Sequence, residues 1–374
     1  MAAVRTGRLS TRTRSDALSG RVLGDFLATM TMVRLNARFR GRSVTGVERF
    51  ASEVTEHLAR RDGISIAETA PSLPQAGWRG HAWEQFILPC AVSRDEILFS
   101  PCNTGPLAVA RQLVVIHDAA VWDGPEGFSR SFRTVYQHLL PRLAKRSAVV
   151  ATVSQFSRSR LAPALGIAEE RILVLGNAVS PGFSPGIRGE ERADGSTFLC
   201  VGSLDPRKNL GRLLRAWIRL LEKGRLPEGA TLQLIGGANP RNFAGMERIE
   251  GSGIEWLGRV DDAELVRRYR AADAFVYPSL YEGFGLPPLE AMACGCPVLL
   301  ANAASLPEVG GAAEEGAVRY FDPGSEIEIA TAIERFLALD ASERALMRQR
   351  ALNRAARFSW ETIAEKVAAA MAAV

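Results

Sequence analysis

One stretch, residues 277–295, constrains the fold of this chain more than any other. The apolar run Ala274 to Tyr277 has the pattern of a short buried strand, and Pro278 follows it directly. Pro287 and Pro288 then indicate the start of a helix, because proline suits the first helical turn, where its missing N–H has no intrahelical partner. The stretch therefore predicts a buried strand, a turn and a helix.

The turn in this stretch has the residues of a ligand site. Gly283 and Gly285 let the backbone approach a ligand closely, and the helix that follows supplies amide donors and the positive end of a dipole. Glu282 lies on the turn, and Glu290 lies about one helical turn into the helix. Carboxylates beside an anion site are useful when they accept hydrogen bonds from sugar hydroxyls. The alternative is a helix-capping turn with solvated glutamates.

Length and composition limit the class of protein. With 374 residues, 47% of them hydrophobic, the chain can form two or three domains. No apolar run approaches the length of a membrane-spanning helix. The cysteines lack metal-ligand spacing, so we expect reduced, buried thiols in a cytoplasmic protein. They are Cys90, Cys102, Cys200, Cys294 and Cys296.

Charge is distributed unevenly. Residues 1–180 contain 23 Lys and Arg and 15 Asp and Glu, a net charge of +8, whereas residues 181–374 contain 23 and 26, a net charge of −3. A basic first half favours anionic partners. Nucleic acid is not favoured, because zinc-ligand spacing, an aromatic–basic RNA-binding pattern and a lysine run are all missing from the sequence. The arginines of residues 1–28 are interpreted as part of a basic extension that lacks the apolar core of a signal peptide.

The first half alternates predicted strands with helices, which indicates a parallel sheet. The strands are expected at 30–36, 64–67, 96–99, 113–116 and 148–153. Thr45 and Gly46 lie between the first strand and an amphipathic helix. His117 follows a predicted strand at the carboxyl edge, where open α/β sheets bind ligands, and is the best placed of the four histidines. Ser154 is expected to cap the next helix.

The second half begins with a predicted strand, Phe198 to Val201, followed by Gly202 and the adjacent cations Arg207 and Lys208. Two cations at a helix start would neutralise a diphosphate together with the helix dipole. Further strands are expected at 232–235, 254–257, 274–277, 298–300 and 318–321, with helices between them and at 327–339, 342–358 and 360–373. This half is therefore also expected to be doubly wound.

Two segments resemble the signatures of glycosyltransferase family 4, whose members have the GT-B fold and retain anomeric configuration. Glu282-Gly-Phe-Gly-Leu-Pro-Pro-Leu-Glu290 is similar to the Glu-x7-Glu signature, and Gly202-Ser-x-x-Pro-Arg-Lys-Asn-Leu210 to the second one. Residues 301–309, including Ser305 and Glu308, resemble the next loop beside the donor. The segments 32–50 and 115–157 are most similar to the bacterial polysaccharide mannosyltransferase branch. The usual Asn-Gly of the family is Asn177-Ala178 here.

The resemblance implies two Rossmann-like, doubly wound domains that face a cleft. The domains would comprise a basic extension (1–28), an acceptor-binding domain (29–180), a linker (181–196), a nucleotide-sugar-binding domain (197–357) and a C-terminal helix that can cross back to the first domain (358–374). The implied catalytic residues are His117, Arg207, Lys208 and Glu282. The implied donor-binding residues are Gly202, Arg207, Lys208, Glu282, Gly283, Phe284, Gly285, Leu286 and Glu290, and the acceptor side is Thr45 and Gly46.

The implied reaction is transfer of a sugar from a nucleotide-sugar donor, with GDP-mannose favoured over UDP-sugars or dTDP-rhamnose. The acceptor would be a saccharide, expected to be linked to a lipid diphosphate at the inner face of the cell membrane. Because no Asp-x-Asp occurs in the sequence, we expect no metal and no cofactor, with cations in place of the metal. The alternatives are another GT-B enzyme, such as a sugar-nucleotide epimerase or a phosphorylase, and a non-catalytic nucleotide-sugar-binding protein.

Overall fold

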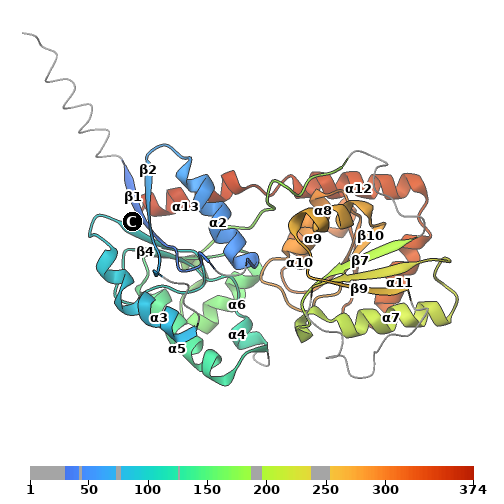
Figure 1. The fold of residues 1–374 in the computed structure, drawn as a ribbon, viewed down its shortest axis with the longest axis horizontal. Coiled ribbons are helices and arrows are strands. Elements are labelled where there is room, and N and C mark those ends of the chain that lie inside the picture. The colour runs from blue at the N-terminus through green and yellow to red at the C-terminus, as the bar shows by residue number, and fades with distance from the viewer. Residues whose placement is uncertain (1–29, 42–43, 73–76, 125–126, 187–195, 237–252) are drawn as a thin grey trace, which may run out of the picture.

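The computed structural model describes residues 30–41, 44–72, 77–124, 127–186, 196–236 and 253–374. The chain forms two α/β domains side by side, each built on a six-stranded sheet (Figure 1). The basic extension expected at residues 1–28, Arg42, and residues 187–195 of the expected linker lie outside the described part. The described helices include none that is both long enough and apolar enough to cross a membrane.

The first domain has a parallel sheet in the order β2-β1-β3-β4-β5-β6. Its strands are β1 (Thr31–Asn36), β2 (Ile64–Thr69), β3 (Ile97–Ser100), β4 (Gln112–Val115), β5 (Val149–Thr152) and β6 (Ile172–Val174). The strand order reverses between β1 and β3, so the loops after these two strands flank the point where ligands bind in open sheets. The short strand β6 was not predicted, because three residues show no alternation.

Helices cover both faces of this sheet (Figure 1). They are α2 (Gly46–Ala59), α3 (Gly77–Phe86), α4 (Ala120–Asp123), α5 (Arg130–Arg146) and α6 (Gln155–Leu165), with short 3-10 helices at Leu88–Ala91 and Glu169–Arg171. Helix α2 forms here because Thr45 and Glu48 make a capping box at its start. Its buried residues Phe50, Val54 and Leu58 recur at helical spacing and fix the face that packs on the sheet.

The second domain has a parallel sheet in the order β12-β11-β10-β7-β8-β9. Its strands are β7 (Thr197–Val201), β8 (Thr231–Ile235), β9 (Ile254–Gly258), β10 (Ala274–Tyr277), β11 (Val298–Ala301) and β12 (Val318–Phe321). This is the order of dinucleotide-binding folds, and it reverses between β7 and β10. The predicted cation loop follows β7 and the glutamate turn follows β10, so the topology brings the two segments together.

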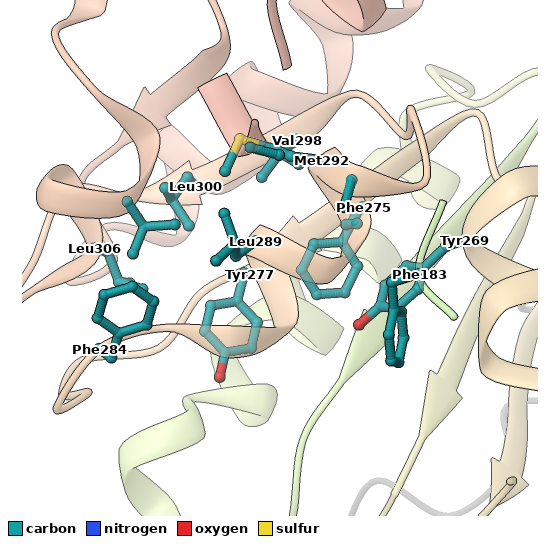
Figure 2. Packing of buried hydrophobic residues seen from close by; sticks show 14 of the residues in the cluster. Phe183, Tyr269, Phe275, Tyr277, Phe284, Leu289, Met292, Val298, Leu300 and Leu306 are labelled. Atoms are coloured by element: carbon teal, nitrogen blue, oxygen red, sulfur yellow. The ribbon is translucent and has the colours of Figure 1, made fainter. Parts of the chain in front are cut away.

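The helices of this domain are α7 (Leu210–Glu222), α8 (Asp262–Ala271), α9 (Leu286–Ala293), α10 (Leu306–Gly310), α11 (Glu326–Leu337) and α12 (Ala341–Ala355), with 3-10 turns at Pro206–Lys208 and Ala313–Glu315. Strand β10 is buried along its whole length and packs against α9. In Figure 2 the ring of Tyr277 lies beside Leu289, with its hydroxyl directed away from the apolar side chains. The core thus fixes the strand whose end begins the glutamate turn.

The last helix, α13 (Trp360–Ala372), returns to the first domain and packs against α2 (Figure 1). Trp360 is 3% exposed, and its ring meets that of Phe50 at 5.7 Å between centroids. The indole of Trp360 donates to the carbonyl of Val179 at 3.0 Å, and Lys366 donates to that of Leu175 at 3.2 Å. The chain therefore joins the two domains twice, once where the second domain begins and again through α13, where the second domain ends.

Two sequence-based expectations were wrong in detail. Arg207 and Lys208 lie in the 3-10 turn Pro206–Lys208 and not in the first turn of α7, because Asn209 has a φ of 57° and separates the two. Buried thiols were expected throughout, but Cys90 is exposed, because it lies in the short 3-10 segment after α3, and Cys102 is half-buried. All five cysteines are free thiols.

Candidate active site

The carboxylate of Glu282 is held where the ends of β7 and β10 meet. Lys208 Nζ donates to its Oε1 at 2.6 Å, as do Ser279 Oγ at 2.6 Å and Tyr277 Oη at 2.7 Å. Lys208 Nζ also donates to Tyr277 Oη at 3.1 Å. Within the described residues no hydrogen bond reaches the second oxygen, Oε2. One oxygen of Glu282 is thus fixed by protein, and the other can accept a ligand hydroxyl.

The charge of this carboxylate follows from its surroundings. Burial alone would raise the pKa of Glu282, but Lys208, Ser279 and Tyr277 together bring it below its ordinary value. Burial, reinforced by the Glu282 charge, holds the pKa of Tyr277 well above its ordinary value. The group is therefore an ionised carboxylate beside a lysine ammonium and a neutral phenol at neutral pH.

Arg207 is the second cation at this end of the sheet. Its guanidinium donates to Asp205 in a two-point arrangement, with Nη2 at 2.7 Å and Nε at 3.1 and 3.2 Å from the carboxylate oxygens. It also lies 5.5 Å from the ring centroid of Phe128, a first-domain residue. The side chain is 24% exposed, so it is oriented and remains accessible to an anion.

Three glycines allow close contacts around this turn. Gly202 lies against Lys208, and a Cβ added at Gly202 would lie 3.5 Å from the Lys208 side chain. Gly285 has a φ of 111°, and an added Cβ would lie 2.8 Å from Leu306. At Gly283 an added Cβ would lie 2.9 Å from the carbonyl of His117, in the other domain. Only glycine fits at Gly283 and Gly285, so the turn can pack directly on the first domain.

Glu290 has a different environment from Glu282. It is 6% exposed on α9 and accepts a hydrogen bond from Tyr269 Oη at 3.3 Å. Burial raises the pKa of Glu290 to about 7, against the opposing charge of Arg49 and the Tyr269 hydrogen bond. Its carboxyl is therefore divided between neutral and ionised forms near neutral pH.

His117 lies just after β4 and is buried, with 6% exposure. Its Nε2 is 2.8 Å from the carbonyl of Pro101, and its ring meets Phe50 edge-on at 5.0 Å between centroids. Burial lowers the pKa of His117 below its ordinary value, although the Pro101 carbonyl opposes this. The imidazole is accordingly neutral at pH 7, with Nε2 donating to that carbonyl, and its backbone touches Gly283.

The two residues expected on the acceptor side lie at the start of α2. Thr45 is the N-cap and is paired with Glu48 through their side chains. A Cβ on Gly46 would lie 3.3 Å from Leu286 Cδ1, so this helix start faces the start of α9. Phe284 is buried at 7% exposure and packs edge-on against Phe358 at 5.8 Å, so its side chain is structural while its backbone belongs to the turn.

The arginines that precede Thr45 mostly pair with carboxylates, so they contribute less to the basic character of the first half than their number indicates. Arg34 pairs with Glu96 at 2.6 Å, and Arg40 pairs with Glu68 at 2.7 Å. Arg38 is 5% exposed and lies 3.6 Å from the buried carboxylate of Glu84. A sequence does not indicate these pairs, because the partners are 28 to 62 residues away.

Several residues that join the two domains were not predicted as such. Arg49 on α2 donates to both oxygens of Asp262 on α8, each at 2.8 Å. Ser154, expected only to cap α6, also donates to the carbonyl of Gly283 at 2.6 Å. Asp118 lies beside Gly283, and its charge helps to raise the pKa of Arg207, after the larger effect of Asp205. The sequence indicated a role for Asp118 in one way only, by its position directly after His117 at the end of a predicted strand.

Sequence comparisons indicate the family to which the chain is similar. Residues 188–354 match the family described as "Glycosyl transferases group 1". The O-antigen chain mannosyltransferase B of Escherichia coli is 34% identical over 278 residues, which is 72% of either chain. This match includes part of each domain, because 72% of the chain is more than either half alone.

Solved structures agree with the fold. Sucrose-phosphate synthase from Thermosynechococcus elongatus superposes with a TM-score of 0.71 at 19% identity, over 91% of this chain and 98% of that one. The Anabaena protein Alr3699/HepE, solved in complex with UDP-glucose, gives a TM-score of 0.67 at 18% identity, over 92% of this chain and 100% of that one. The two parallel sheets are those of the GT-B fold.

Proposed function

The chain belongs to the group 1 glycosyl transferases and is a glycosyltransferase; from this premise we propose that it moves mannose from GDP-mannose to a saccharide acceptor of a bacterial surface polysaccharide, with retention of anomeric configuration. The observation that supports the proposal most is the Glu282–Lys208 pair at the strand-order reversal of the second domain. A carboxylate and two cations at one point suit a ligand that has both hydroxyls and a diphosphate.

In this proposal Arg207 and Lys208 stabilise the charge that develops on the departing nucleoside diphosphate. Both are oriented by a carboxylate of the protein, Arg207 by Asp205 and Lys208 by Glu282. Fixed cations of this kind act mainly in the transition state, where the negative charge is largest. The backbone amides of residues 283–286 would add donors at the start of α9.

The two glutamates would bind different parts of the donor. The free oxygen of Glu282 accepts hydroxyls of the transferred sugar, and Glu290 accepts those of the ribose. His117 lies beside the sugar as a neutral imidazole, and the departing phosphate helps to remove the proton of the acceptor hydroxyl. In this mechanism no metal ion is required, because Arg207 and Lys208 take the place of the metal. Transfer should therefore persist in EDTA. Loss of transfer in EDTA, restored by Mg²⁺ or Mn²⁺, would contradict this part of the mechanism.

The choice of mannose rests on the relative named as an O-antigen mannosyltransferase, whose match includes part of each domain. The UDP-glucose complex of a protein with this fold supports a nucleotide-sugar donor in general. UDP-sugars and dTDP-rhamnose remain the competing donors to be tested.

A thermal-shift screen tests the donor. The protein is heated with GDP-mannose, GDP, UDP-glucose, UDP-N-acetylglucosamine or dTDP-rhamnose, each at matched concentration. A ligand at 100 times its Kd adds about 2.7 kcal/mol to the free energy of unfolding, which a melting curve resolves. GDP-mannose should give the largest shift in the wild type and a much smaller one in Lys208→Ala. A larger shift with a UDP- or dTDP-sugar would replace mannose in the proposal.

We further propose that the acceptor is attached to a lipid diphosphate. Support comes from exposed cations near the end of α5, namely Arg142, Lys145 and Arg146, on the more basic half of the chain. Each basic residue near an anionic leaflet contributes about 1 kcal/mol, within a Debye length. Sedimentation should show binding to anionic but not neutral vesicles, with release by salt. Equal binding to both, or to neither, would favour a soluble acceptor.

A further inference from the structure

The start of helix α6 is capped by the opposite domain. The carboxylate of Glu308, on α10, accepts hydrogen bonds from the backbone N–H groups of Gln155 at 2.8 Å and Phe156 at 2.7 Å. These are the first two helical residues of α6, whose N–H groups have no intrahelical partner. In Figure 1, α6 and α10 lie on either side of the point where the domains meet. A carboxylate at this end also interacts favourably with the helix dipole.

The same helix start holds the glutamate turn. Ser154 Oγ donates to the carbonyl of Gly283 at 2.6 Å, and Ser157 Oγ donates to it at 3.0 Å. The two serines are themselves fixed, because the N–H of Ser157 donates to Ser154 Oγ at 2.9 Å. We define the cross-domain clasp as Ser154, Ser157, Gly283 and Glu308, together with the α6 amides that Glu308 accepts.

The clasp reaches Glu282 through one peptide unit. On the other side of the turn, Ser305 Oγ lies 2.9 Å from the carbonyl oxygen of Glu282 and 2.8 Å from that of Phe284, and its one proton is shared between them. The carbonyls of residues 282, 283 and 284 are thus all bonded, the middle one from the first domain. Arg354 keeps Glu308 in place by donating to its carbonyl at 2.6 Å and to that of Val309 at 2.9 Å.

We propose that Glu308, Ser154 and Ser157 are positioning residues that hold the first domain against the turn, so that Glu282 and His117 face the same donor sugar. The expected change in kcat rests on the proposed function, because it requires that the enzyme transfers a sugar. When the domains separate, α6 loses the cap from Glu308, and the Gly283 carbonyl loses two donors. The clasp therefore favours the arrangement in which the domains are together, without touching the substrate.

The test uses Glu308→Gln, on a half-buried side chain, and Ser157→Ala in the full chain. The controls are Ser159→Ala, on the same helix but bonded within it, and Glu314→Gln, an exposed charge of the same type. We expect kcat to fall about tenfold in both clasp variants, as for loss of a helix cap, while the Kd for the nucleoside diphosphate is unchanged. Both controls should match the wild type.

Two further measurements separate positioning from loss of structure. Because both residues act in one clasp, the double variant should lose little more than the worse single variant. Small-angle X-ray scattering of the ligand-free proteins should show a larger radius of gyration for both clasp variants than for the controls, with unchanged far-ultraviolet circular dichroism.

The inference is overturned if kcat and radius of gyration of both clasp variants equal those of the controls, or if the Kd weakens in parallel with kcat. The scattering result needs no substrate. If the wild type transfers no sugar but the clasp variants still expand, the clasp stands and the proposed function fails. If the wild type is active and neither variant expands nor slows, the clasp fails alone.

Discussion

At the scale of single residues, the site consists of charges held in opposed pairs. Lys208 is fixed by Glu282, and Arg207 by Asp205. In the proposed function, such preorganisation means that the donor would meet cations already oriented toward its diphosphate, so little reorganisation would be needed during the reaction. It also means that removing a cation leaves a partly buried carboxylate without its counter-charge.

The first prediction concerns these cations. Lys208→Ala and Arg207→Ala should each lower turnover by a factor of about 10²–10³, because each acts as the diphosphate departs. Lys208→Ala should also cost roughly 1–3 kcal/mol of stability, since Glu282 is left unpaired. The double variant Lys208→Met with Glu282→Gln should regain stability but not activity. Arg215→Ala, an exposed cation on α7, serves as the control; near-normal turnover in the site variants would exclude the diphosphate role.

The second prediction is a pH dependence at Glu290, whose pKa of about 7 lies above its ordinary value. Between its unfolded pKa of about 4.3 and about 7, the folded state binds more protons than the unfolded one, so the contribution of Glu290 to stability falls as the pH rises. In the proposed function the ionised form of Glu290 accepts the ribose hydroxyls more strongly than the protonated form, so nucleoside diphosphate affinity should rise through pH 7.

Calorimetric titrations across this range measure both effects. Glu290→Gln should weaken nucleotide binding and remove the part of the pH dependence that exceeds the titration of the phosphate itself. It should also lose less stability than the wild type as the pH rises. A Glu290→Gln variant whose binding and pH profile match the wild type would assign the ribose to another residue.

At the scale of elements, the strand–turn–helix unit β10–α9 was predictable because its signals are local. The strand 274–277 is an uninterrupted apolar run, and Pro287 and Pro288 indicate the start of the helix. Between them, Gly285 has a positive φ of 111°, which favours glycine. The 3-10 turn at Pro206–Lys208 was predicted as a helix start, since proline favours both. Only the left-handed Asn209 separates it from α7.

The third prediction tests this turn. Gly285→Ala should destabilise the protein by more than about 1 kcal/mol, because alanine is strained at a φ of 111° and its Cβ would lie 2.8 Å from Leu306. The control is Gly182→Ala, where an added Cβ meets nothing within 4 Å and φ is not positive. Denaturant unfolding gives both values. Equal stability of the two variants would mean that the turn adopts another conformation.

At the scale of the whole molecule, the sequence predicted two doubly wound halves, and the family resemblance implied a last helix that crosses back, but the side-chain contacts that join the halves were not predicted. Arg49 and Asp262 are 213 residues apart, and Ser154 and Gly283 are 129 residues apart. Nothing local distinguishes such residues from ordinary surface arginines and capping serines. Periodicity and turn chemistry therefore predict the two doubly wound sheets and their strand–turn–helix units, whereas the side-chain contacts between domains require three-dimensional structure.

The fourth prediction concerns the return of α13 to the first domain. Trp360→Ala should destabilise the protein by about 3–5 kcal/mol, the usual cost of emptying a buried aromatic site. It would also remove the hydrogen bond to Val179 and the contact with Phe50. Ile327→Ala, a 58% exposed apolar residue on α11, is the matched control. A melting temperature in Trp360→Ala equal to that of the control would show that α13 adds little to the first domain.

The most direct test of the proposed reaction is the configuration of the bond that the enzyme makes. The wild type is incubated with GDP-α-mannose and a saccharide acceptor, and the new linkage is assigned by nuclear magnetic resonance from its one-bond C1–H1 coupling. Lys208→Ala provides the inactive control. We predict an α-mannosyl product, which retains the configuration of the donor. A β-mannosyl product would contradict the retaining mechanism, and failure to transfer sugar from every nucleotide sugar tested would contradict the assignment of the site.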